Sequence, residues 1–473
     1  MTSFRGALIG AALLALASVS ASAKVFSPTT FKLANGLEVV VVEDHLAPVV
    51  SQMVWYRCGA ADEEWGHSGI AHFLEHLMFK GTPSVGPGEF SKIVARNGGE
   101  DNAFTFYDYT AYFQTIAVDR LELIMKLEAD RMQNLSLTDE QVYPERDVII
   151  EERRQRIETN PGARLGEAMR HALFANSPYG RPAIGWKQEM EQLTTADAVA
   201  WYKKWYTPDN ATLIVVGDVK PDQVKALAEE YYGPIPSHPV PPRIRPQIAP
   251  LGGAVQRITL KDENIHEPAF SRIYVAPNYS QKTKKTALAL EVFDEIFGTG
   301  TTSRLYKALA LKLKVASSVS SSYDDTAVDP IAYEVSAQPA PGKDLIDVEK
   351  GVDDVIQDLL KNGVTDAEVT DAKTRLQAQA ILARDSLMGP AHSIGEAVAT
   401  GQSIDDIENW PDNIAAVTKD EVNEALRSVL GNPPPGGVTG VTGWLLPANG
   451  NSRSPMDAAA AANTVPVSSG PIR

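Results

Sequence analysis

Cysteine is nearly absent from this sequence, because Cys58 is the single one among 473 residues. One cysteine excludes an internal disulfide framework. Its neighbours, VWYRCGA, are typical of a strand, and we expect Cys58 to be a small, buried packing residue.

Positive charge is scarce relative to negative charge, and the formal net charge is −16. Such an excess of carboxylates argues against nucleic acid or an anionic membrane as a partner. It would favour cationic ligands such as basic peptides, although a solubilising surface explains the charge equally well.

Long hydrophobic runs are missing beyond the N-terminus, so we predict no stable membrane insertion. The N-terminus itself places Arg5 before the apolar stretch GALIGAALLALASV, and small residues follow at Ala21-Ser22-Ala23. This pattern predicts a signal peptide over residues 1–23, cleaved after Ala23, and a mature chain exported to a bacterial periplasm. A permanent membrane anchor is the alternative, but the apolar core is short for one.

The chain is too long for one hydrophobic core, and two large domains are expected. A proline-dense stretch at 233–253, GPIPSHPVPPRIRPQIAPLGG, cannot lie within a sheet or helix and predicts a linker. It separates a first domain at 24–232 from a second at 254–447, and residues 448–473 are predicted to be a flexible tail.

The two halves show a similar succession of predicted elements without a residue-level repeat, which suggests duplication. In the first half, FKLANGLEVVVV predicts a hairpin around Asn35-Gly36, and NATLIVVGDV predicts a buried strand. A long helix is expected from about Thr138, where TDEQ resembles a capping start. In the second half, a strand at FSRIYVAP precedes a helix at KKTALALEVFDEIFG, two strands follow at KVASSVSSSYDD and IAYEVSAQP, and two helices come after them.

The segment HFLEHLMFKGT, from His72 to Thr82, contains the most specific chemical pattern. On a helix, His72, Glu75 and His76 cluster on one face. An apolar stripe lies on the opposite face and comprises Ile70, Phe73, Leu74, Leu77 and Met78. The stripe gives the helix a reason to be ordered, and the polar trio is expected to point away from that packing.

Two imidazoles four residues apart on a helix are close enough to share one metal ion. Zinc takes about four ligands, and a hydrolytic site keeps one position for water. Glu75 is placed to accept a proton from that water. An ordinary solvated helix face with histidines at chance spacing is the alternative.

A third ligand is sought in YPERDVIIEERRQRIE, a helix rich in glutamate. Glu145 and Glu152 are seven residues apart and share a face, whereas Glu151 is turned by about 100°. Spacing alone does not choose among these three.

Taken together, these motifs resemble the pitrilysin/insulinase family of inverzincin zinc metallopeptidases, whose signature is H-x-x-E-H. The resemblance covers nearly the whole mature chain. It includes NGGEDNAFTFYDYTAYFQT, ERDVIIEE, SPYGRPAIGW and WYTPDNATLIVVGDV, in that order after the H-x-x-E-H segment. The length resembles the two-domain bacterial and mitochondrial-processing-peptidase branch.

The resemblance implies roles for individual residues. His72, His76 and Glu152 would bind one Zn²⁺ per chain, and Glu75 would be the general base. Glu145 would support a ligand or the base from outside the metal shell. Asn102 and Ala103 match an edge strand with which the family holds the substrate backbone by strand addition.

The resemblance also implies an α+β fold of two related domains, each an antiparallel sheet covered by helices, enclosing a chamber for peptides or unfolded segments. One feature departs from the family. Its second domain usually has an arginine and a tyrosine seven residues apart after S-R-L, and they stabilise the oxyanion. Alignment on Ser303-Arg304-Leu305 places Ala310 and Ser317 there; Tyr306 and Tyr323 are nearby but do not restore the spacing.

We therefore expect a zinc-dependent endopeptidase subunit, completed by a related partner subunit that carries the Arg/Tyr pair in a heterodimer. A non-catalytic scaffold or peptide-binding member of the same family is the alternative. The intact H-x-x-E-H motif argues against it, whereas the missing pair argues for it.

Overall fold

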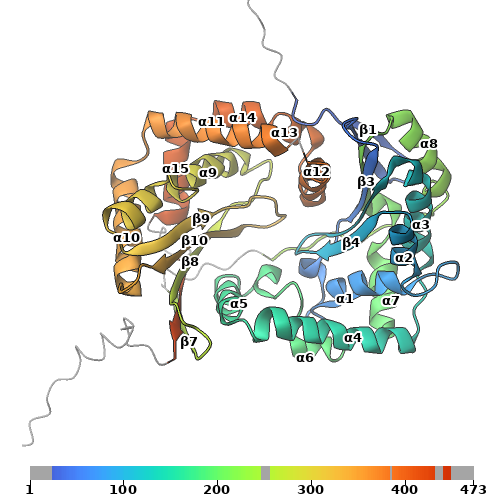
Figure 1. Ribbon diagram of the computed structural model, residues 1–473, viewed down its shortest axis with the longest axis horizontal. Helices are drawn as coiled ribbons and strands as arrows, with labels where there is room; N and C mark the ends of the chain where they lie inside the picture. The colour runs from blue at the N-terminus through green and yellow to red at the C-terminus, as the bar shows by residue number, and fades with distance from the viewer. Residues whose placement is uncertain (1–23, 247–255, 384–385, 432–439, 449–473) are drawn as a thin grey trace, which may run out of the picture.

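Two β-sheets, one in each half of the chain, organise the structure, a computed structural model that describes residues 24–246, 256–383, 386–431 and 440–448 (Figure 1). The predicted signal peptide, residues 247–253 of the predicted linker and the predicted tail beyond residue 448 lie outside the described residues. Within these residues, no helix combines the length and the apolar content that crossing a bilayer requires.

The first sheet has six strands in the order β1-β2-β6-β3-β5-β4. All neighbours are antiparallel except β2 and β6, which are parallel. The predicted hairpin around Asn35-Gly36 is confirmed, and Gly36 adopts the positive φ (94°) that this turn requires. The bounds are β1 Thr29–Lys32, β2 Glu38–Glu43, β3 Val49–Tyr56, β4 Glu100–Thr105, β5 Thr110–Ala117 and β6 Ala211–Gly217.

Helices cover the first sheet and enclose the first core, into which Val54, Tyr56 and Cys58 point from one sheet face. The predicted capping start is confirmed, because Thr138 and Gln141 form a capping box at the start of α4. Cys58 is free and fully buried, as expected. The helices are α1 Ile70–Leu77, α2 Glu89–Arg96, α3 Leu121–Asn134, α4 Asp139–Arg153, α5 Pro161–Leu173, α6 Lys187–Met190, α7 Thr195–Trp205 and α8 Pro221–Tyr231.

The second sheet has five strands in the order β7-β11-β8-β10-β9. Its strands are β7 Gln256–Asp262, β8 Ala269–Ala276, β9 Ala316–Ser322, β10 Ile331–Pro339 and β11 Val441–Pro447. Its helices are α9 Lys284–Phe297, α10 Leu345–Asn362, α11 Asp366–Ala383, α12 Gly389–Thr400, α13 Ile404–Glu408, α14 Trp410–Ala416 and α15 Lys419–Leu430. The three strands predicted in this half are thus present.

The two sheets share one topology. Without the edge strand β1, the order β2-β6-β3-β5-β4 corresponds strand by strand to β7-β11-β8-β10-β9. In each sheet the first pair is parallel and the other pairs are antiparallel. The expectation of two related α+β domains is therefore confirmed, with sheets that are mixed by one parallel pair each.

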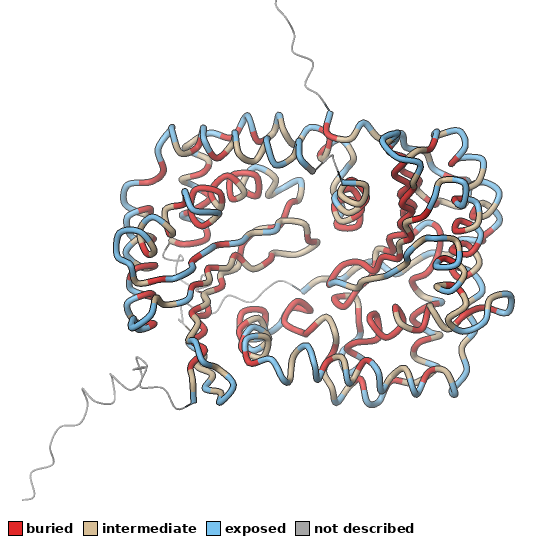
Figure 2. The backbone as a smooth tube through the Cα atoms, viewed as in Figure 1, coloured by how far each residue is buried: buried red, intermediate tan, exposed pale blue. Residues whose placement is uncertain are grey.

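The halves exchange helices across their boundary (Figure 1). Helix α12, from the second half, packs Ile394 against Trp55 and Ile214 on the inner face of the first sheet. Helix α5, from the first half, packs Met169 against Val441 of the second sheet. Most residues of the strands nearest α12 are buried (Figure 2). Each sheet is therefore covered in part by a helix from the other half.

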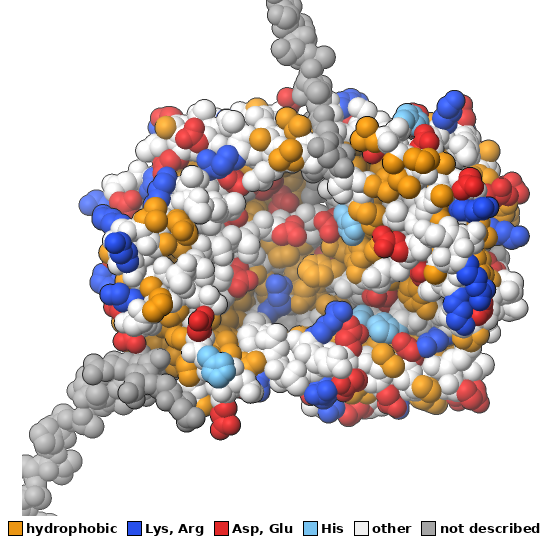
Figure 3. Space-filling view, viewed as in Figure 1, with side chains coloured by type: hydrophobic (Ala, Val, Ile, Leu, Met, Phe, Trp, Pro, Cys, Tyr) orange, Lys and Arg blue, Asp and Glu red, His pale blue; other side chains and the backbone are white. Residues whose placement is uncertain are grey.

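A hollow lies between the halves (Figure 3). The described part of the predicted linker crosses this region without forming a helix or strand. Arg245 of the linker forms ion pairs with Asp62 (2.9 Å), Asp108 (3.1 Å) and Asp329 of the second half (3.4 Å). The linker is thus anchored to both halves by charge.

Candidate metal centre

Helix α1, which carries the H-x-x-E-H motif, is fixed at its start by a buried carboxylate. Glu63 accepts hydrogen bonds from the N–H groups of Gly69 and Ala71, each at 3.0 Å, and so satisfies donors that a helix start leaves free. Burial raises the pKa of Glu63 to about 8. Gly69 has a φ of 90°, and a Cβ there would lie 2.8 Å from the carbonyl oxygen of Ile184, so the approach requires glycine.

The trio lies on the predicted face of α1, but that face is covered rather than solvated. His72 and Glu75 are each only 8% exposed, and His76 is half-buried. Helix α4 and strand β4 pack over this side, while the apolar stripe is buried on the other. The trio therefore faces away from the packing of the apolar stripe, as predicted, but a second layer of the protein closes over it, so it is not a solvated helix face.

Glu152 lies opposite both histidines. Its Oε2 atom is 3.4 Å from Nε2 of His72 and 3.4 Å from Nε2 of His76. This oxygen is buried and accepts no hydrogen bond within the described part of the chain, whereas Oε1 pairs with Arg156 at 2.8 Å. Two ligand atoms on a tetrahedral zinc, with bonds of about 2.0–2.1 Å, are separated by about 3.3–3.4 Å. The distances from this oxygen to the two nitrogens are therefore those expected between ligands of one zinc ion.

The three glutamates of α4 do not all face the histidines, because the helix turns successive residues to different sides. Glu145 accepts a hydrogen bond from Nδ1 of His76 at 2.8 Å and pairs with Lys80 through its other oxygen. Because Nδ1 carries the proton in this bond, Nε2 of a neutral His76 is left with its lone pair toward Glu152. Glu151 is instead exposed and binds Arg154. Of the three alternatives, Glu145 and Glu152 face the histidines and Glu151 does not.

The two histidines differ in how readily they are protonated. Burial and the neighbouring charge of His76 lower the pKa of His72 to about 4. Burial also disfavours protonated His76, but its hydrogen bond with Glu145 and the neighbouring carboxylates of Glu152 and Glu75 outweigh this and raise its pKa to about 9. The neighbouring His76 lowers the pKa of Glu152, against the effect of its burial. A carboxylate and a neutral imidazole are ready as ligands, and binding a cation would displace the proton of the other imidazole.

Glu75 is held beside this cluster. The hydroxyl of Thr105 donates a hydrogen bond to its carboxylate at 2.6 Å. Burial raises the pKa of Glu75 to about 7, and the Thr105 bond partly opposes the shift. A carboxyl group that titrates near neutral pH can both accept and return a proton.

Strand β4 forms one edge of the first sheet and pairs only with β5. Asn102 is exposed on it, and Ala103 is half-buried. The side-chain oxygen of Asn102 accepts the N–H of Ala103 at 2.9 Å. Thr105 ends the same strand, so this edge of the sheet leads directly to Glu75.

Sequence reasoning missed three residues of this arrangement: Thr105, Lys80 and Glu63. Lys80 is four residues after His76, a spacing that puts both on one helical face and could have indicated it. Thr105 and Glu63 come from other elements, and no local spacing links them to the motif.

The residues aligned with the family's Arg/Tyr pair lie in the second half. Ala310 is part of a π-helical turn at Tyr306–Lys312, and Ser317 is exposed on β9. The nearby arginine, Arg304, forms an ion pair with Glu368 at 2.7 Å. The hydroxyl of Tyr323 donates to the carbonyl of Pro277. Neither side chain is available as a substitute in this arrangement.

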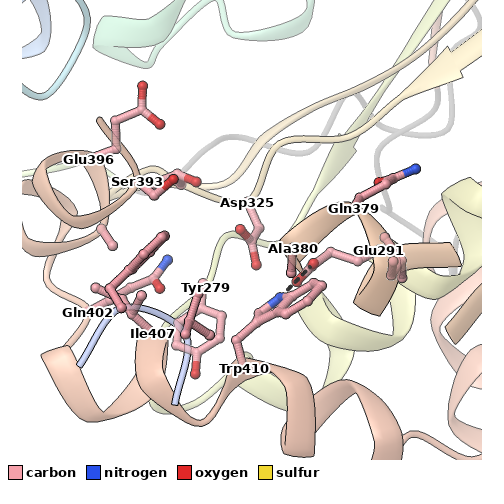
Figure 4. A pocket seen from close by; sticks show the side chains of 15 residues that line it. Tyr279, Glu291, Asp325, Gln379, Ala380, Ser393, Glu396, Gln402, Ile407 and Trp410 are labelled. Atoms are coloured by element: carbon pink, nitrogen blue, oxygen red, sulfur yellow. Dashed lines mark hydrogen bonds between the residues drawn. The ribbon is translucent and has the colours of Figure 1, made fainter. Parts of the chain in front are cut away.

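A separate acidic cavity of about 390 Å³ is lined mainly by residues of the second half (Figure 4). Glu291 accepts a hydrogen bond from the indole of Trp410 at 2.9 Å, and Asp325 lies close to it. Glu396 reaches the cavity from α12. None of the motif residues lines this cavity, so we assign it no part in hydrolysis.

Comparison with known proteins identifies the family. A family model described as insulinase (peptidase family M16) matches residues 38–186, and one described as peptidase M16 inactive domain matches residues 192–376. The zinc protease PqqE of Helicobacter pylori is 30% identical over 384 residues, which cover 79% of this chain and 85% of that protein. This chain belongs to peptidase family M16. The resemblance inferred from the sequence is confirmed.

Other M16 relatives are similar over the same length. An uncharacterized zinc protease of Mycobacterium tuberculosis, Rv2782c, is 30% identical over 413 residues, covering 86% of this chain and 92% of the relative. The beta subunit of the mitochondrial-processing peptidase of Neurospora crassa is 26% identical over 424 residues, covering 85% of each. Several relatives are thus named as zinc proteases, which supports a peptidase role.

Solved structures agree in fold. A protease from Helicobacter pylori superposes with a TM-score of 0.80 at 26% identity, covering 89% of this chain and 99% of the other. The first half of the periplasmic protease PqqL of Escherichia coli has a TM-score of 0.77 at 20% identity, covering 93% and 96%. The two-domain M16 architecture is therefore shared.

Proposed function

We propose that this M16 protein is a zinc-dependent endopeptidase whose ligands are His72, His76 and Glu152. The observation that carries the proposal is one Glu152 oxygen, which is buried, has no hydrogen-bond partner among the described residues and lies 3.4 Å from the Nε2 atoms of both histidines. An unpaired buried carboxylate oxygen costs free energy unless a cation or donor meets it. The zinc-protease names of the relatives favour zinc among the possible cations.

Each residue then has a defined task. When bound, zinc would supply Lewis-acid polarisation of a water molecule and of the scissile carbonyl. Glu75 accepts the proton of the attacking water and returns it to the leaving amine, while Thr105 keeps its carboxylate oriented. Glu145 fixes the tautomer and orientation of His76 through Nδ1.

The substrate would be an extended peptide or unfolded segment added to the edge strand β4. Asn102 and Ala103 would bind its backbone, and the strand would guide it toward Glu75. The hollow between the halves favours such a flexible substrate over a folded protein (Figure 3).

A related partner subunit would complete the site in a heterodimer. Ala310 and Ser317 cannot donate as arginine and tyrosine do, and Arg304 and Tyr323 are engaged elsewhere. A relative is itself named a subunit, and this chain matches only 49% of full-length PqqL. Export to the periplasm after cleavage at Ala23 remains part of the proposal.

A non-catalytic, peptide-binding member of the family is the second candidate. The match of residues 192–376 to a domain described as inactive and the missing Arg/Tyr pair favour it. Such a protein would have no need of an intact set of ligands.

The test measures zinc content and peptide hydrolysis for the full mature chain and for Glu75→Gln, each with and without a related candidate subunit. We expect about one zinc per chain in both proteins. We also expect hydrolysis that needs the partner and is lost in Glu75→Gln. Glu151→Gln is the matched control, because it makes the same chemical change on an exposed glutamate. Undiminished hydrolysis by Glu75→Gln would remove Glu75 from its role, and a zinc-free, inactive pair would favour the second candidate.

A further inference from the structure

A cavity of about 360 Å³ opens directly beside the candidate metal centre. His72 and Thr105 belong to its wall, so it is continuous with the residues that would bind zinc and orient Glu75. The opposite wall comes from α5 and the segment after it, including Arg170 and Arg181. A side chain next to a bond held at the zinc would therefore enter this cavity.

The cavity is lined by two arginines without a direct ion pair in the described part of the chain, although the carboxylates of Glu63 and Glu189 act on Arg181 from further away. Among the described residues, neither Arg170 nor Arg181 has a carboxylate within ion-pair distance. Glu167 also lines the cavity, but it is taken up by Arg153 through two hydrogen bonds of 2.9 Å. Glu152, the carboxylate that we propose as a zinc ligand, is paired with Arg156.

The two arginines differ in what holds them. Arg181 is almost fully buried and donates to the carbonyls of Ala60 and Glu63, so it has a structural task. Arg170 stacks its guanidinium 5.3 Å from the ring centre of Tyr107. Its Nη1 group is buried and donates no hydrogen bond within the described part of the chain. A buried guanidinium donor without an acceptor is costly, and a carboxylate is its best-matched acceptor.

We propose that this cavity, the arginine pocket, binds a carboxylate of the peptide, with Arg170 as the residue that selects it. The inference rests on the proposed peptidase function and adds its substrate class: peptides with an aspartate or glutamate next to the cleaved bond. A free C-terminal carboxylate offers the same chemistry and is the other source. The excess of negative charge on the protein as a whole makes a local anion preference a property of this pocket and not of the surface.

The experiment uses full-length, zinc-loaded Glu75→Gln protein, in which peptides bind without being cleaved. Fluorescent peptides of one neutral sequence carry Glu, Gln or Lys at a central position, scanned along the sequence, with amidated or free C-termini. We expect one position at which the Glu peptide binds about tenfold more tightly than the Gln peptide, and Lys more weakly still. A preference for the free C-terminus alone would also support the pocket and assign it to the terminal carboxylate. Equal affinities for all peptides would overturn it.

Variants then assign the selection to Arg170. Arg170→Met should bring the ratio of the affinities for the Glu and Gln peptides near one, and Arg170→Glu should bind the Lys peptide most tightly. Arg154→Met is the control, because Arg154 is exposed and paired with Glu151, and it should keep the ratio. If Arg170→Met kept the full preference, the selection would not come from Arg170 and the proposal would fail. If Arg170→Met does not fold, as judged by circular dichroism, the ratio of affinities measured in the Glu75→Gln protein alone decides whether the pocket binds a carboxylate.

Cleavage by the wild type, assayed with its partner on the same peptides, separates the two proposals. Selective binding without any cleavage would sink the peptidase function and leave the pocket. Cleavage of all peptides at one rate would leave the peptidase function and sink the pocket.

Discussion

At the residue scale, the metal centre depends on which nitrogen of His76 holds its proton. Glu145 accepts from Nδ1, and Lys80 in turn pairs with Glu145. His72 has no such support, because its Nδ1 is buried and has no hydrogen-bond partner among the described residues. The affinity for metal should therefore be sensitive to Glu145, the one carboxylate that orients a ligand without being one.

We predict that Glu145→Gln weakens zinc binding by about 10–100-fold, because the amide lacks the charge that strengthens His76 as a ligand. Competition with a chromophoric zinc chelator measures the change. Glu151→Gln, on the same helix but exposed, should leave the affinity unchanged. An unaltered affinity in Glu145→Gln would contradict the role given to Glu145.

At the element scale, the exchanged helices α5 and α12 hold the halves together. Strand β3 points Val54 and Tyr56 into the first core and Trp55 toward α12, so both of its faces are buried. A Cβ at Gly395 of α12 would lie 2.0 Å from the Trp55 ring. The two halves can approach this closely only because glycine has no side chain.

We predict that Gly395→Ala lowers the thermal midpoint of unfolding, because overpacking at such a contact costs about 1–3 kcal/mol. Differential scanning calorimetry of the full chain measures it. Gly166→Ala is the matched control: it also lies inside a helix, nothing occupies the space within 4 Å, and alanine favours the helix. A midpoint that falls equally in both variants would show that helical glycine itself, and not the contact with Trp55, is responsible.

The elements themselves were largely predictable from sequence, but their partners were not. The Asn35-Gly36 turn fixed a hairpin, and the spacing of His72 and His76 fixed a shared helical face. The apolar residues 53–56 of β3 required cover on both faces, yet nothing in their sequence indicates that α12 supplies it. Thr105 was missed for the same reason, since a contact between a strand end and Glu75 leaves no local period.

At the scale of the whole molecule, buried carboxyl groups link stability to pH. Burial raises the pKa of Asp325 to about 7, and Glu396 is raised to about 7 for the same reason. The neighbouring charge of Asp324 adds to the rise in the pKa of Asp325, whereas a hydrogen bond with Glu291, which lines the same cavity, opposes it. In unfolded chains such groups titrate near pH 4, so between about pH 4 and 7 the folded state binds more protons than the unfolded state.

It follows that stability falls as the pH rises through this window. We predict that the thermal midpoint decreases from pH 5 to pH 8 and that Asp325→Asn flattens the decrease, because it removes one of the groups that must ionise. Calorimetry at several pH values is the measurement, with Asp371→Asn, an exposed carboxylate of α11, as the control. A pH profile that is the same in Asp325→Asn and in the wild type would contradict this assignment.

The central claim is that one zinc ion is held by two histidines of α1 and a glutamate of α4. Anomalous diffraction from crystals of the full mature chain, collected on both sides of the zinc absorption edge, tests it most directly. The account predicts one strong peak per chain, within about 2.0–2.2 Å of Nε2 of His72, Nε2 of His76 and a carboxylate oxygen of Glu152. No peak in zinc-supplemented crystals, or a peak that Glu152 does not touch, would contradict it.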